Sequence, residues 1–227
     1  MKIVVKLGGH AFPLELDAER LSGYVEVFKK IKEEGHRLVV VAGGGPGGIS
    51  SAIAAARTGA KTVLIERYGH LGGMATGGLV NIIPDLSDIS GRQHIYGLTL
   101  ELLNRVDKRG GASYPAKKDW GTADKKKVDY YLDAGLGWFY VRQDHNTGKQ
   151  RVLYSAVVDP EILKDELNDM VLEARVDLLL HSWGTQVIME GNTVKGVFFE
   201  SKSGRQAILG KVIIDATGDG DMFVAAG

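Results

Sequence analysis

Residues Arg37 to Arg67, RLVVVAGGGPGGISSAIAAARTGAKTVLIER, carry the strongest structural pattern in this chain. The segment begins with an apolar, β-branched run from Leu38 to Val41, which is typical of a buried parallel strand. A glycine-rich turn follows, then a segment with small apolar residues every three or four positions, and then a second strand from Thr62 to Ile65. This order predicts a βαβ unit at the centre of an α/β protein.

The glycine turn has the spacing of a dinucleotide-binding loop. Gly43 permits a tight turn, Gly45 lets the backbone approach a pyrophosphate, and Gly48 lets helix and strand pack closely. Pro46 stands where the helix should begin, and that helix end offers N–H groups to the pyrophosphate. Glu66 lies near the position, roughly 20 residues after the first glycine, of the carboxylate that holds a ribose hydroxyl. An acid there favours FAD or NAD over NADP; the alternative is a glycine turn that binds nothing.

Composition restricts the function classes. Lysine plus arginine and aspartate plus glutamate both number 28, so no net charge attracts nucleic acid or an anionic membrane. The longest apolar runs fall short of the ~20 residues that a membrane span needs, and no secretory signal is visible. The chain has no cysteine, which excludes disulfides and agrees with a cytoplasmic protein. Its six histidines are scattered, so we predict no metal site.

From Val39 onward the chain resembles the FAD-dependent oxidoreductases of the glutathione-reductase-like type. The matching pieces are VVVAGGGPGGISSAIAAARTGAKTVLIERYGHLGGMATGGLV and VVDPEILKDELNDMVLEARVDLLLHSWGTQVIMEGNTVKGVFFESKSGRQAILGKVIIDATGDGD, within residues 39–227. The resemblance implies an α/β fold, a Rossmann-like parallel sheet flanked by helices with an inserted antiparallel β-meander, and FAD as cofactor. The cofactor-binding residues indicated by the motifs and the resemblance are Gly43, Gly45, Pro46, Gly48, Glu66, Arg67, Gly73, Met74, Thr76, Gln186, Val187, Thr217, Gly218 and Asp219.

The resemblance also implies a role for each region outside the glycine turn. The loop from Arg67 to Gly78 would wrap the pyrophosphate, with Thr76 supplying a hydroxyl. The backbone at Gln186 and Val187 would hold adenine, and Asp219 in the A-T-G-D segment would accept a ribityl or ribose hydroxyl. The presence of this segment together with the first glycine turn favours FAD over NAD as the cofactor. A calcium loop is the alternative for Asp215, Asp219 and Asp221, but the helix–loop–helix frame is absent.

The first 45 residues resemble a different family. The pieces MKIVVKLGGHAF, GYVEVFKKIKEEGH and RLVVVAGGG are similar to the amino-terminal portion of archaeal uridylate kinases of the amino-acid-kinase family. The resemblance implies an alternative phosphate-binding loop at Lys6, Gly8 and Gly9, although the remaining kinase segments have no counterpart. Because both families contain VVVxGGG, we interpret the chain as a chimera of natural, designed or mistaken-assembly origin. We expect a helix over residues 18–34, and a strand over residues 1–7 at an outer position of the sheet or apart from it.

These patterns predict three segments. They are a kinase-like βα segment at 1–36, an FAD-binding domain at 37–80 and 155–227 with its β-meander at 185–210, and a substrate-side insertion at 81–154. Within the insertion we expect a helix over 94–108 and a hairpin of strands 138–142 and 150–154. Asp159 should cap the helix that follows, and a strand over 177–181 should then rejoin the parallel sheet.

The favoured function is an FAD-dependent oxidoreductase domain that transfers hydride through its flavin. Members of that family continue beyond the second fingerprint, so we expect cofactor binding with weak or absent turnover. The alternatives are a fragment of a UMP-type nucleotide kinase and a non-catalytic chimeric or engineered scaffold. We expect a small-molecule substrate and no nucleic-acid or membrane partner, and we leave a homo-oligomer open. No residue is assigned a catalytic role.

Overall fold

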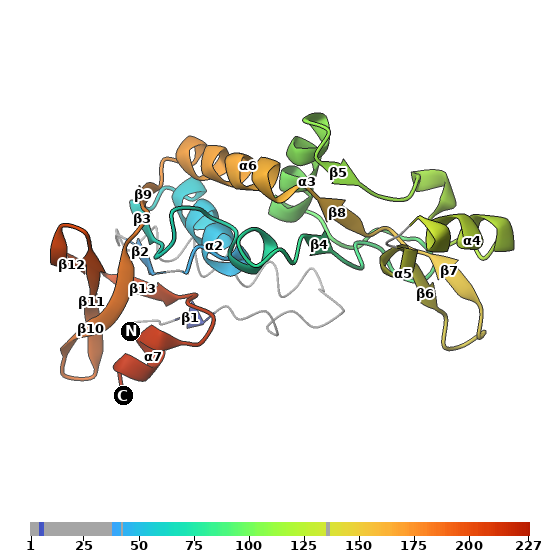
Figure 1. Cartoon of the computed structure of the whole chain (residues 1–227). Helices are drawn as coiled ribbons and strands as arrows, with labels where there is room; N and C mark the ends of the chain where they lie inside the picture. Colours follow the sequence, from blue (N-terminus) through green and yellow to red (C-terminus); the bar gives the residue numbers. More distant parts are fainter. Residues whose placement is uncertain (1–4, 7–37, 42, 135–136) are drawn as a thin grey trace. The chain divides into compact units, whose positions relative to one another are not determined.

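The computed structural model describes residues 5–6, 38–41, 43–134 and 137–227 (Figure 1). The chain divides into two compact units. Unit 1 is Met1–Gly78 with Leu167–Gly227, and unit 2 is Leu79–Glu166. The helix predicted over 18–34 and the kinase-like glycines Gly8 and Gly9 lie outside the described residues.

Unit 1 is built on a five-stranded parallel sheet in the order β1, β13, β2, β3, β9 (Figure 1). The strands are β1 (Val5–Lys6), β13 (Val212–Asp215), β2 (Leu38–Val41), β3 (Thr62–Ile65) and β9 (Asp177–Leu179). β2 lies at the centre of the sheet, paired with β3 on one side and β13 on the other. β1 pairs with β13 at the edge of the sheet, which is the outer position expected for an added strand. The sheet is therefore of the Rossmann type with one additional strand.

Alternation along the strands assigns side chains to the two faces of this sheet. One face carries a buried cluster of Ile65, Val197, Phe199, Ile213 and Met222. Leu64 and Ile214 are neighbours of cluster members along their strands, so they point to the opposite face, and both are buried. That face is where α2 (Pro46–Arg57) packs against β2 and β3. The core of unit 1 thus lies on both sides of the sheet.

Helix α2 follows the glycine turn directly. Pro46 takes its first turn, and Gly59, just beyond its carboxyl end, has φ 93°, the left-handed backbone that is usual after a helix. The buried face of α2 consists mainly of small residues: Gly48, Ile49, Ser51, Ala52, Ile53 and Ala55. Small side chains let the helix approach the sheet closely, so the amino end of α2 has a fixed position at the end of β2.

The antiparallel β-meander is confirmed as a separate three-stranded sheet. It consists of β10 (Trp183–Glu190), β11 (Thr193–Ser201) and β12 (Gly204–Leu209), in that order. β11 packs against β13, and α7 (Asp221–Ala225) packs against β10 and β13. The meander therefore covers the face of the parallel sheet that carries the buried cluster.

Helix α6 (Pro160–Glu173) has the predicted cap at its amino end. Oδ1 of Asp159 accepts hydrogen bonds from the backbone N–H groups of Glu161 (2.8 Å) and Ile162 (3.0 Å). Beyond its carboxyl end, Arg175 has φ 59°, and the next backbone N–H, of Val176, donates to the Val171 carbonyl at 3.2 Å. An L-residue occupies the left-handed position where glycine is usual.

Replacing Arg175 with glycine should raise the free energy of unfolding by about 0.5 kcal/mol. A left-handed backbone costs an L-residue roughly 1 kcal/mol, and glycine removes this cost. Part of the resulting stabilisation is offset because glycine has greater backbone freedom in the unfolded chain. Arg175 is exposed, so its replacement removes no buried contact. Urea denaturation measures the change. Arg175→Ala is the matched control, since alanine keeps the strain, and equal stabilities of the two variants would contradict the assignment.

Unit 2 consists of short elements arranged around two small antiparallel sheets, β4-β8-β5 and β6-β7. Its elements are β4 (Ile82–Ile83), α3 (Leu98–Lys108), β5 (Ala112–Ser113), η2 (Lys117–Asp119), α4 (Lys125–Asp133), α5 (Gly137–Tyr140), β6 (Val141–Gln143), β7 (Gln150–Val152) and β8 (Ala156–Val158). The predicted hairpin is present as β6 and β7, and its register pairs Val141 with Val152.

Several predicted boundaries were wrong, each for a local reason. The helix expected from residue 94 begins at Leu98, because Gly97 has φ 65° and precedes it as the N-cap. The strand expected over 138–142 begins only at Val141, since the preceding residues form the helical turn α5. The strand expected over 177–181 ends at residue 179, before a left-handed residue at 181. Strand β8 and helix α4 were not predicted.

Candidate functional site

The glycine turn lies at the carboxyl end of β2 and leads into α2. Gly45 is the N-cap with an extended backbone (φ −77°, ψ 175°), and among the described residues no side chain caps this helix. The first helical turn carries no acidic residue. The first N–H groups of a helix have no partner within it, so Gly47 and Gly48 present donors at the positive end of the helix dipole. This helix end can bind an anion such as a pyrophosphate.

Three loops meet at this edge of the sheet. A β-carbon placed on Gly43 would lie 3.5 Å from Cα of Thr217, which belongs to the loop after β13. A β-carbon placed on Gly73 would lie 3.0 Å from Cα of Gly45, so the loop after β3 also approaches the turn. β3 and β13 flank β2 on opposite sides, which makes the end of β2 a topological switch point. Open α/β sheets bind their ligands at such points.

The side chain of Glu66 is buried against the glycine turn. A β-carbon on Gly44 would stand only 2.7 Å from Glu66 Oε2. The backbone N–H of Tyr68 donates to Oε1 at 2.7 Å, which fixes the carboxylate. Burial raises the pKa of Glu66, and the Tyr68 N–H and the positive charge of Arg67 oppose that shift. The predicted ribose-binding carboxylate therefore points toward the glycine turn and is held by the backbone of its own loop.

The loop after Glu66 holds the remaining residues predicted on this side. Arg67 is exposed, and its Nη2 donates to the Tyr68 hydroxyl at 2.8 Å while its guanidinium lies over the Tyr68 ring. Met74, in the short helix η1 (Gly73–Ala75), is 65% exposed. Thr76 is fully buried and donates its hydroxyl to the Leu71 carbonyl at 2.6 Å. The structure thus uses the Thr76 hydroxyl to shape the loop.

The second fingerprint is organised by a buried carboxylate at the end of β13. Asp215 is 1% exposed, and its Oδ1 accepts from the backbone N–H (3.1 Å) and the hydroxyl (2.7 Å) of Thr217. Its Oδ2 accepts from the N–H of Phe223 in α7 at 2.8 Å. Gly218 follows with φ 90°, which explains the glycine, and Asp219 is exposed. Thr217 and Gly218 therefore lie in the loop that approaches Gly43.

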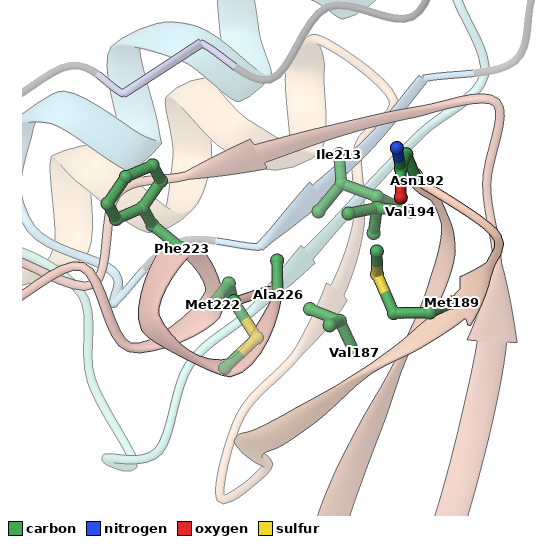
Figure 2. Close-up of a pocket in the computed structure, with 9 residues that line it drawn as sticks. Val187, Met189, Asn192, Val194, Ile213, Met222, Phe223 and Ala226 are labelled. Atoms are coloured by element: carbon green, nitrogen blue, oxygen red, sulfur yellow. The ribbon is translucent and has the colours of Figure 1, made fainter.

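The predicted adenine-binding pair lies on β10. Gln186 Oε1 accepts from Arg205 Nη2 at 2.8 Å. Val187 lines a cavity of about 310 Å³ between the β-meander and α7. Figure 2 shows Val187 and Met189 of β10 and Met222 of α7 among the side chains that line this cavity. The assignment of adenine to the backbone at this pair stays a prediction.

Two residues of this site were not recognised as such in the sequence. Gly44 is the variable position of the G-x-G motif, yet it is the glycine whose β-carbon would collide with Glu66 and Leu71, both at 2.7 Å. The signal was a run of three glycines where the motif needs only two. Asp215 was considered only as an alternative calcium ligand, whereas its carboxylate accepts three backbone and hydroxyl donors.

Within residues 5–6, 38–41, 43–134 and 137–227, no group of three or more His, Cys, Asp or Glu side chains is arranged to hold a metal ion. In the same part of the chain, no helix has the length and apolar character required to cross a membrane.

Comparisons with known proteins agree with the two resemblances. A family model described as FAD dependent oxidoreductase matches residues 39–227. At the amino terminus, the uridylate kinase of Haloarcula marismortui is 33% identical over 69 residues, and that of Methanocaldococcus jannaschii is 49% identical over 47 residues. These matches cover 30% and 20% of this chain, and they span only 30% and 21% of the kinases.

Solved structures show a more distant likeness. Thermovibrio ammonificans THI4 is 15% identical with a TM-score of 0.44, covering 93% of this chain and 70% of THI4. A geranylgeranyl bacteriochlorophyll reductase-like protein of Thermoplasma acidophilum is 18% identical with a TM-score of 0.49, covering 85% of this chain and 42% of that protein.

Proposed function

Since this chain belongs to the family of FAD dependent oxidoreductases, we propose that unit 1 binds FAD where the loops after β2, β3 and β13 meet. The observation that carries the proposal is the buried carboxylate of Glu66, held against Gly44 beside an uncapped helix end. A ribose hydroxyl of the adenosine half would donate to Glu66. The pyrophosphate would accept from the N–H groups of Gly47 and Gly48.

The described residues fit a dinucleotide at this edge. A β-carbon on Gly45 would meet only the Gly43 carbonyl, at 3.7 Å, so the space on that side of the turn is open. Around the opening, the loops after β3 and β13 are fixed by their own hydrogen bonds through Thr76 and Asp215. When bound, FAD supplies hydride-transfer chemistry, and the protein orients the cofactor and limits its exposure to solvent.

Oxidoreductase activity on a small molecule is the corresponding proposal for the whole protein. Unit 2 contains the predicted substrate-side insertion at 81–154, and we assign it that role without naming a substrate. A cytoplasmic location and a homo-oligomer also stay predictions, the former from the cysteine-free composition.

The direct test is a titration of the purified chain with FAD, followed by flavin absorbance, fluorescence and calorimetry. We expect saturable binding, and we expect ADP to compete because it carries the ribose and pyrophosphate that this site recognises. Binding of riboflavin in preference to ADP would contradict the placement of the adenosine half. A chain that stays folded and binds no FAD would overturn the proposed function.

The replacement Glu66→Gln should separate cofactor binding from stability. Glutamine keeps the shape but cannot act as a charged acceptor, so FAD affinity should fall about tenfold. Burial raises the folded-state pKa of Glu66 above its ordinary value near 4.5. The folded state therefore binds the Glu66 proton more tightly than the unfolded state does. The stability that this proton contributes is fully present below pH ~4.5 and is lost as the pH rises through the folded-state pKa.

The cofactor-free Glu66→Gln protein should consequently be more stable than the parent protein at pH 7, and the difference should shrink toward pH 4. Thermal unfolding across this pH range, without FAD, measures the effect. If the stability of Glu66→Gln relative to the parent protein instead increases toward acid pH, the ionised carboxylate is stabilised by its neighbours and is not penalised by burial.

Kinase function has one supporting observation, the amino-terminal similarity to uridylate kinases. Of the predicted phosphate-binding residues, Lys6 belongs to β1, while Gly8 and Gly9 lie outside the described residues. Since the similarity spans only 30% of the first kinase, we expect no phosphorylation of UMP by ATP. A coupled ADP-release assay with UMP checks this expectation.

A further inference from the structure

A histidine outside the fingerprint motifs is packed on the loop that carries Glu66. His181 follows β9 and has φ 51°, a left-handed backbone that is uncommon for a residue with a side chain. A β-carbon placed on Gly69 would lie 2.6 Å from Cε1 and 2.7 Å from Nε2 of His181. His181 is exposed, and its imidazole lies in the space beside Gly69 that a larger residue there would share with it.

Backbone hydrogen bonds fix the two segments against each other. The N–H of Glu66 donates to the Leu179 carbonyl at 2.8 Å, and the N–H of Ser182 donates to the Glu66 carbonyl at 2.8 Å. Between them, the N–H of His181 donates to the Tyr68 carbonyl at 3.1 Å. The pairing of β3 with β9 is thus extended past both strand ends, and it places the His181 imidazole over Gly69.

Tyr68 connects His181 to the Glu66 carboxylate. The N–H of Tyr68 holds Glu66 Oε1, and the carbonyl of the same residue accepts from His181. Covering Gly69 restricts the residue next to Tyr68, and glycine is the residue with the greatest backbone freedom. Without the imidazole, the donor that orients the carboxylate would lose part of its fixed position.

We propose that His181 is a positioning residue for Glu66 and so sets the affinity for the adenosine half of FAD. This inference rests on the proposed function of the site. The replacement His181→Asn is the informative variant, because asparagine tolerates the left-handed backbone but lacks the ring. The backbone N–H of His181, which donates to Tyr68, is kept in this variant, so only the contact of the ring with Gly69 is lost. FAD affinity should fall about tenfold, within the range found for residues in contact.

A double-mutant cycle provides the readout that a merely structural role would not change. If His181 acts through Glu66, then His181→Asn should have little further effect on FAD or ADP affinity in a Glu66→Gln background. The exposed hairpin residue His145 supplies the matched control, and His145→Asn should leave affinity unchanged. Thermal unfolding of each variant shows whether the fold is kept.

The outcomes separate the two proposals. If the parent protein binds FAD and Glu66→Gln weakens binding, but His181→Asn binds like the parent, the inference about His181 is overturned alone. Additive losses in the cycle overturn it as well, because His181 would then act independently of Glu66. If the folded parent protein does not bind FAD, the proposed function itself has failed. Equal losses in the single and double variants are the expected result.

Discussion

Replacing Gly45 with alanine should weaken FAD binding by about 100-fold while leaving the cofactor-free fold intact. In the structure the added methyl group would meet only the Gly43 carbonyl, at the ordinary distance of 3.7 Å. With a pyrophosphate at the helix end, the same methyl group would keep the phosphate from the N–H groups of α2. Losing two charge-assisted hydrogen bonds at about 1.5 kcal/mol each corresponds to a loss of that size.

The measurement is an FAD titration by calorimetry together with thermal unfolding of the cofactor-free protein. Ser50→Ala, an exposed change on the same helix, is the control and should match the parent protein in both. An alanine at position 45 that leaves FAD affinity within twofold of the parent would mean that the pyrophosphate does not approach this turn. If the variant loses both FAD affinity and its folded structure, the space beside Gly45 is not open in the cofactor-free protein.

Replacing Gly44 with alanine should, unlike the change at Gly45, greatly lower the stability of the protein even without FAD. The methyl group would stand 2.7 Å from Glu66 Oε2 and 2.7 Å from Leu71 Cδ2, so a buried side chain must move. Overpacking of this kind typically costs about 1–3 kcal/mol. Urea denaturation of the cofactor-free protein measures the change.

The neighbouring glycine provides a matched control. A β-carbon on Gly43 would meet Cα and the carbonyl oxygen of Thr217 at 3.5 Å, which is ordinary contact, so Gly43→Ala should be much less destabilising. Shortening the acid in the double variant Gly44→Ala, Glu66→Asp should restore part of the lost stability, because it withdraws the carboxylate from the new methyl group. If the alanine variants at 43 and 44 unfold at the same urea concentration, the collision with Glu66 does not determine the role of Gly44.

Much of the fold was predictable because its signals are local. The apolar strands β2 and β3, the small-residue helix α2 and the hairpin turns of the β-meander each follow from a short sequence pattern. Unit 2 was predicted less well. Strand β8 has only three residues, and helix α4 begins with three lysines that resemble a solvated face. Its cap at Asp124, which accepts from the N–H groups of Lys126 and Lys127, was the available signal.

The candidate site shows the same division. The glycines of the motif, the acid at the end of β3 and the A-T-G-D segment were found from spacing, because phosphate and ribose recognition requires those residue types near strand ends. The roles of Gly44 and His181 depend on contacts between segments far apart in the sequence. Gly44 meets Glu66 and Leu71, and His181 meets Gly69. No periodicity or motif encodes such contacts.

The amino-acid sequence by itself determined a parallel sheet with a glycine turn at the end of its central strand, and an acid at the end of the next. Spacing along one chain suffices for these features, since each involves a single strand–turn–helix unit. The tertiary structure alone decided which glycine must lack a side chain for steric reasons, and what holds the acid in place. Both answers depend on the distances between the loops after β2, β3 and β9, which are set by the order in which the parallel strands pair.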